Sequence, residues 1–122
     1  MSNEADAATL PLLVACLCAQ WCGTCRDYQL LFTQLQTDFP YTQFTWIDVE
    51  DESELVDPVE VENFPTLLMA RQGQPLFFGP VMPHLETLRR LIQNHQDVTQ
   101  PTARQSADVV RLAARLTARL RQ

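Results

Sequence analysis

The sequence predicts an α/β sandwich, in which helices flank a central mixed sheet. Two observations indicate this class. Segments with the apolar pattern of strands alternate with segments of helical periodicity, and the last two predicted strands are joined by a short turn. Alternation favours parallel strand pairs, whereas a hairpin adds an antiparallel pair. A chain of 122 residues is long enough to bury the core of one such domain, so we expect one sheet of about four strands.

The first predicted elements are a buried strand, the helix that follows it and a second strand. Residues 12–18 form an uninterrupted apolar run of strand length, typical of a strand that is covered on both faces. Residues 24–37 carry apolar side chains at helical spacing, and Pro40 follows the end of this helix. Residues 41–49 alternate between two faces, which predicts the second strand.

The middle of the chain is predicted to form a short helix, a hairpin and a further helix. Residues 50–62 are acidic with few apolar side chains, which is consistent with a short exposed helix. Residues 66–70 and 75–78 are apolar strands, and the turn 71–74 between them contains a glycine. Residues 83–95 begin with a proline, which suits the first turn of a helix.

The ends of the chain are expected to lie outside the core domain, which we place at residues 10–96. Residues 1–9 are predicted to be a flexible lead, and residues 97–122 a linker and a basic amphipathic helix over about 102–120. The helix has an apolar stripe that consists of Val109, Leu112, Ala113, Leu116 and Leu120. Because such a stripe needs burial, we expect this helix to pack on the domain, with extension away from it as the alternative.

Charge and hydropathy exclude two classes of partner. The formal net charge is −6, although residues 100–122 hold five arginines and one aspartate. An acidic body argues against nucleic acid, whose phosphates need neutralisation. The apolar run at 10–19 is too short to span a bilayer and lacks the flanks of a signal peptide. We therefore expect no membrane association and a cytoplasmic location.

All four cysteines lie within residues 16–25, and structural disulfides are rare in the cytoplasm. Cys22 and Cys25 have the spacing of a redox-active pair at the start of a helix. The helix N-terminus favours an anion, so Cys22 would be the nucleophilic thiolate. Cys25, almost one turn later, would then be the resolving thiol. Trp21 would give an apolar docking surface, and Gly23 would let the two thiols approach.

A metal site is the alternative use of the same cysteines. All four together form a C-x-C-x3-C-x2-C pattern, but a ligand set of this kind would have to bend the preceding strand. The two histidines, His84 and His95, have no ligand spacing. We expect no metal, and a four-thiolate binding module stays open as an alternative.

Two motifs resemble the thioredoxin family: WCGTC at 21–25 and Phe64-Pro65-Thr66 at the start of a strand. The likeness extends through Gly73 and Gly79 and covers roughly residues 11–95. It implies a three-layer sandwich, a redox-active Cys22–Cys25 disulfide in place of a bound cofactor, and a cis peptide before Pro65. The substrate-contacting residues that it implies are Trp21, Gly23, Thr24, Phe64, Pro65, Thr66 and Gly79.

The chain departs from the family pattern beneath the motif. Cys16 stands where the family usually has a buried carboxylate, and Trp46 stands where it usually has a lysine. Thr24 replaces a proline, which should make the couple more oxidising. About ten residues precede the first core strand, so we expect no room for the additional N-terminal strand and helix of full-length thioredoxins.

Cys16 and Cys18 are two apart on a strand and therefore share one face. Buried cysteine usually behaves as a small inert apolar residue. The alternative is that they are accessory thiols, one of which exchanges with Cys25 or replaces the missing carboxylate as a proton acceptor.

The leading function is that of a cytoplasmic thiol–disulfide oxidoreductase in cell redox homeostasis, with protein disulfides as clients and a thiol reductant or reductase as electron donor. A protein-interaction or redox-sensing module with little turnover is the alternative, and the four-thiolate metal module is the third. We expect a monomer or a weak homodimer.

Overall fold

The computed structural model describes residues 11–19, 23–57, 59, 61, 65–82, 84–96, 98 and 105–120, with the side chains of Thr24 and Leu120 outside the description. Strands and helices alternate as the sequence predicts, and a hairpin follows. In chain order the elements are β1 (Leu13–Cys18), α2 (Gly23–Asp38), β2 (Gln43–Asp48), α3 (Ser53–Val56), β3 (Thr66–Arg71), β4 (Gln74–Pro80), α4 (Leu85–His95) and α5 (Ala107–Leu120).

The sheet has four strands in the order β2-β1-β3-β4. β1 runs parallel to β2 and antiparallel to β3, and β3 runs antiparallel to β4. The turn between β3 and β4 places Gln72 and Gly73 at positive φ, as tight hairpin turns require. The mixed sheet and the α/β class are therefore confirmed.

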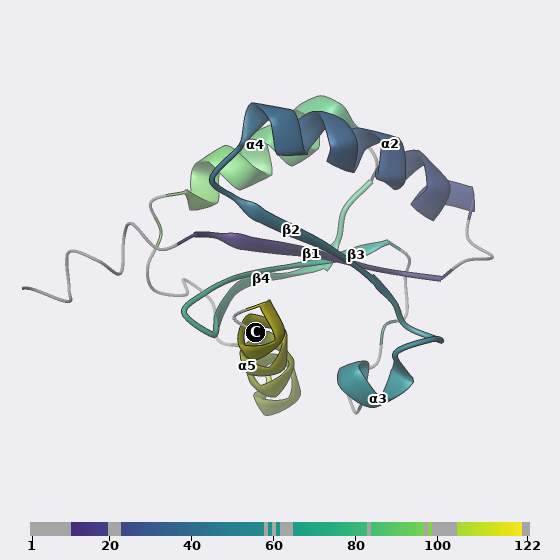
Figure 1. Ribbon diagram of the computed structural model, residues 1–122, viewed down its shortest axis with the longest axis vertical. Coiled ribbons are helices and arrows are strands. Elements are labelled where there is room, and N and C mark those ends of the chain that lie inside the picture. The colour runs from purple at the N-terminus through teal and green to yellow at the C-terminus, as the bar shows by residue number, and fades with distance from the viewer. Residues whose placement is uncertain are drawn as a thin grey trace, which may run out of the picture.

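One face of the sheet is covered by α2 and α4 (Figure 1). Alternate residues of β1 point toward these helices and include Val14, Cys16 and Cys18. They meet the buried side of α2 and the Leu88–Ile92 side of α4. Cys16, Cys18 and Cys25 all belong to this apolar cluster, because the end of β1 and the start of α2 meet there.

The opposite face is covered by α5, with α3 beside it (Figure 1). Val109, Leu112, Ala113 and Leu116 pack against the other alternate residues of β1 and against β3. The extra C-terminal helix is therefore present, and these four residues of its apolar stripe are buried. The three layers are the α2/α4 helices, the sheet, and the α5/α3 helices.

The start of α5 differs from the prediction. The helix begins at Ala107, later than the expected 102, because Ser106 caps it. The Ser106 hydroxyl accepts a hydrogen bond from the Val109 amide at 3.2 Å, and its carbonyl accepts the first helical bond from Val110. Helical periodicity alone does not mark such a boundary.

Arginines on the exposed side of α5 hold the acidic segment around α3. Arg119 forms an ion pair with Glu52 at 2.5 Å. Arg115 donates to the carbonyls of Leu55 at 3.0 Å and Asp57 at 2.7 Å. Arg111 pairs with Asp108 on its own helix. Two of the three arginines therefore join this helix to the acidic run.

Candidate redox site

The sulfurs of Cys16, Cys18 and Cys25 gather where β1 ends and α2 begins. Cys18 is the last residue of β1, and Cys25 lies in the first turn of α2. The two form a disulfide with their Cα atoms 5.9 Å apart. Their side chains are 1% and 2% exposed, respectively. The bond therefore joins a central strand to the first turn of a helix within the core.

Cys16 is the third sulfur of this group. It lies on the same face of β1 as Cys18, as strand alternation predicts, and its Sγ is 3.3 Å from that of Cys18. Because Cys18 carries no proton in the disulfide, the Cys16 thiol is the donor in this contact. Cys16 is fully buried.

Tyr28 lies one turn along α2 from Cys25 and closes the site from the helix side. Its ring is fully buried, and its hydroxyl donates to the carbonyls of Val81 and Met82 in the segment after β4. Burial raises the pKa of Tyr28 above its ordinary value, and the nearby negative charge of a Cys16 thiolate would raise it further. Tyr28 therefore acts here as a neutral donor.

Aromatic rings occupy the β2 side of the group. Trp46 is the register partner of Cys16. Its ring meets that of Phe32 edge-on at 5.8 Å, and Phe32 also meets Phe44 edge-on at 5.3 Å. Sulfur and aromatic side chains, that of Tyr28 included, thus lie around Cys16.

The start of β3 lies beside the end of β1. Thr66 pairs with Leu17, next to Cys18, and the preceding Pro65 is buried. Gly79 lies one strand further away, opposite Leu67 on β4. Gly23 is exposed as the first residue of α2, with open space around its α-carbon. Thr66 and the preceding Pro65 thus lie beside the end of β1, whereas Gly79 lies on the next strand.

The family model described as Thioredoxin matches residues 4–94, about three quarters of the chain. The chain belongs to the thioredoxin family. The thioredoxin of Chlamydia muridarum is 24% identical over 94 residues, which cover 77% of this chain and 92% of that protein. A thioredoxin H-type of Fagopyrum esculentum is 32% identical over 63 residues, covering 52% and 54% of the two chains.

Solved thioredoxins show the same fold. The X-ray structure of Fasciola hepatica thioredoxin superposes with a TM-score of 0.64 at 25% identity, covering 76% of this chain and 88% of that one. Family membership and a disulfide-forming cysteine pair together support a thiol–disulfide oxidoreductase activity in general.

Part of the thioredoxin motif lies outside the described residues. This applies to Trp21, Cys22 and Phe64, and to the side chain of Thr24. The Cys22–Cys25 pair and the cis peptide before Pro65 therefore remain predictions. What the structure adds is a different partner for Cys25, namely Cys18.

In the disulfide state, two of the candidate metal ligands are not available as thiolates. Metal is bound by thiolates, and Cys18 and Cys25 are joined to each other. Within the described ranges, no three His, Cys, Asp or Glu side chains are arranged to hold a metal ion.

Of the helices in the described part of the chain, none is long and apolar enough to cross a membrane.

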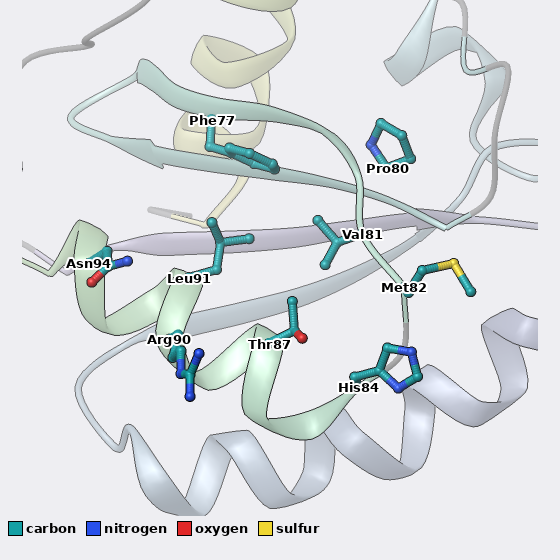
Figure 2. A pocket seen from close by; sticks show the side chains of 9 residues that line it. All are labelled: Phe77, Pro80, Val81, Met82, His84, Thr87, Arg90, Leu91 and Asn94. Atoms are coloured by element: carbon teal, nitrogen blue, oxygen red, sulfur yellow. The ribbon is translucent and has the colours of Figure 1, made fainter.

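An open hollow of about 530 Å³ lies between β4 and α4, away from the buried sulfurs. Figure 2 shows that its walls come from β4, from the segment that follows it and from α4. Apolar Phe77 and Leu91 line it together with polar His84 and Arg90. Tyr28 links this hollow to the sulfur group, since the residues whose carbonyls it binds also line the hollow.

Sequence reasoning missed Tyr28. Its spacing of three residues from Cys25 places both on one face of α2, which was the available signal. Its hydrogen-bond acceptors lie more than fifty residues away along the chain, so no local pattern indicates them.

Proposed function

We propose that this chain is a thiol–disulfide oxidoreductase that acts on protein disulfides, with Cys22 as nucleophile and Cys25 as resolving thiol. The observation that carries the proposal is the disulfide at Cys25, in the first turn of α2 of a thioredoxin-family fold. Cys25 thus forms a disulfide in this fold. A resolving thiol must form and release such a bond during exchange.

The position of the motif supports the assignment of Cys22 as nucleophile. Cys22 immediately precedes Gly23, the first residue of α2. The unpaired amides and the dipole of a helix N-terminus stabilise a thiolate and lower its pKa. Cys25 is buried, so a client disulfide would first meet Cys22.

The client would bind along the start of β3. The candidate contacts are Trp21, Gly23, Thr24, Phe64, Pro65, Thr66 and Gly79. Thr66 pairs with Leu17 beside the sulfurs, which supports the inclusion of the Pro65–Thr66 segment. A cis peptide before Pro65 would present its backbone groups to an extended client segment.

The remaining features of the proposal follow from the same chemistry. The redox-active disulfide would serve without a bound cofactor, and a thiol reductant or a reductase would supply electrons. The cytoplasm, with its reduced thiol pool, is the proposed compartment. We propose a monomer or weak homodimer, without nucleic-acid or membrane partners.

Insulin reduction with dithiothreitol as electron donor tests the proposal. We expect the wild-type protein to accelerate precipitation of the insulin B chain and Cys22→Ser to lose this acceleration. Cys25→Ser should accumulate a mixed disulfide between Cys22 and insulin. Val110→Ala, on the exposed side of α5, should match the wild type. A wild-type rate equal to that of dithiothreitol alone would refute the proposal.

A redox-sensing module is the second candidate. It is favoured by the burial of Cys18 and Cys25, which shields their disulfide from external thiols. This function predicts that the disulfide forms and breaks with the potential of the buffer while insulin is not turned over.

A further inference from the structure

We propose that Cys18 is a third redox-active cysteine. It attacks the Cys22–Cys25 disulfide and forms a buried Cys18–Cys25 disulfide in its place. This inference rests on the proposed function, because that function supplies the Cys22–Cys25 disulfide. The site consists of Cys18 and Cys25, with Cys16 beside them.

Geometry supports the exchange. Cys18 comes from β1 and Cys25 from α2, and the Cα atoms of the two lie 5.9 Å apart, within the ordinary range for a disulfide. Both belong to the same apolar core cluster. Cys25 therefore has two possible disulfide partners. The spacing of the motif makes Cys22 one of them, and the packing of α2 on β1 makes Cys18 the other.

The exchange balances without an added oxidant. The client disulfide first oxidises Cys22 and Cys25 and leaves as two thiols. The Cys18 thiolate then attacks Sγ of Cys25. The Cys18–Cys25 bond forms, the Cys22–Cys25 bond breaks, and Cys22 leaves as a thiolate with the electron pair. The proton that Cys18 lost is replaced by one that Cys22 gains when it becomes a thiol.

Two features favour this direction. A thiol of low pKa is a good leaving group, and Cys22 precedes the N-terminus of α2. The new disulfide has no polar hydrogen, so it suits the apolar cluster in which both sulfurs are buried. In the disulfide state the Cys16 thiol lies 3.3 Å from Cys18 Sγ. At the same separation it would donate a hydrogen bond to the Cys18 thiolate before the exchange.

The consequence is an oxidised protein in which Cys22 is again a thiol. External reductants would reach the stored disulfide only through the reverse exchange or through opening of the core, since both of its sulfurs are buried. The protein would thus stay oxidised at Cys18 and Cys25 while Cys22 remains available as a nucleophile.

Disulfide mapping of Cys22→Ala tests the inference. The reduced, unfolded variant is refolded in a glutathione redox buffer, so that burial does not limit access to the thiols. Thiols are then blocked with N-ethylmaleimide, and the chain is cut with chymotrypsin after Leu17, Trp21 and Tyr28. Trypsin would not serve, because Arg26 is the first arginine and the chain has no lysine, so all four cysteines would stay in one peptide.

We expect the peptide with Cys18 to be joined to the peptide with Cys25 in most of the refolded Cys22→Ala protein, which then carries one blocked thiol, at Cys16. When Cys18→Ala is added to Cys22→Ala, the same two peptides should separate. When Cys16→Ala is added instead, they should stay joined. Oxidised wild-type protein should show the same joined pair, with blocked thiols at Cys16 and Cys22.

Other patterns overturn the inference. These are three blocked thiols or only glutathione adducts in Cys22→Ala, a link to Cys16 instead of Cys18, or a wild type that holds only the Cys22–Cys25 bond. Insulin reduction is measured in parallel. Turnover without a Cys18 link would leave the proposed function standing and refute this inference. A Cys18–Cys25 disulfide in Cys22→Ala, together with no insulin reduction by the wild type, would refute the proposed function. It would then also refute the proposed exchange that forms this disulfide from the Cys22–Cys25 bond in the wild type.

Discussion

The hydroxyl of Tyr28 donates a hydrogen bond to the carbonyl of Met82, 3.1 Å away, from a ring that is fully buried in the layer that holds the cysteines. It also donates to the carbonyl of Val81. The helix that carries Cys25 is thereby tied to the segment between β4 and α4. Tyr28 is thus a structural support of the redox site.

Replacement of Tyr28 by phenylalanine should lower the free energy of unfolding by about 1–3 kcal/mol, since two carbonyls lose their buried donor while the ring stays. Urea unfolding measures the change. The matched control is Tyr41→Phe, because Tyr41 is 89% exposed and its hydroxyl is in solvent. Equal stability of the two variants would contradict the role of Tyr28.

The raised pKa of Tyr28 predicts a loss of stability at alkaline pH. In the unfolded chain tyrosine has a pKa of about 10, and the folded protein holds this proton more tightly. The contribution is therefore complete below about pH 10 and falls as pH rises above it. Urea unfolding at about pH 9 and pH 11 should show a steeper loss for the wild type than for Tyr28→Phe. Parallel losses would show that Tyr28 ionises as it does in the unfolded chain.

Burial of α5 predicts that it is part of the stable fold. Leu112 is fully buried against the sheet, so Leu112→Ala should destabilise the protein by about 2–5 kcal/mol. Val110, on the same helix, is 44% exposed, and Val110→Ala should change the unfolding free energy by less than about 0.5 kcal/mol. Thermal or urea unfolding gives both values. A Leu112→Ala protein as stable as the wild type would mean that α5 does not pack on the sheet in solution.

The ion pair between Arg119 and Glu52 should contribute little. Both side chains are partly exposed, so a double-mutant cycle with Arg119→Ala and Glu52→Gln should give a coupling of at most about 1 kcal/mol. The coupling should fall when salt is raised, because salt screens exposed charges. Arg111→Ala is the control, since Arg111 pairs within its own helix. A coupling that does not depend on salt would contradict this interpretation.

The sequence was sufficient for the architecture because each element has a local signal. The apolar run before the motif predicts β1, the glycine at 73 predicts the turn, and alternation places Cys16 and Cys18 on one face. The pairing of Cys25 with Cys18 depends on how closely α2 approaches β1, which is a tertiary distance. The start of α5 depended on a single capping serine, and the partners of Tyr28 on packing between distant segments.

The central claim is that this chain performs reversible thiol–disulfide exchange through Cys25. The most direct test equilibrates the protein in thiol–disulfide buffers of graded potential, blocks the remaining thiols and counts them by intact mass. We predict that two of the four thiols disappear together at a potential of about −120 to −270 mV, and that Cys25→Ser abolishes the transition to an internal disulfide. Four thiols at every potential, or a Cys25→Ser protein that titrates like the wild type, would contradict the account.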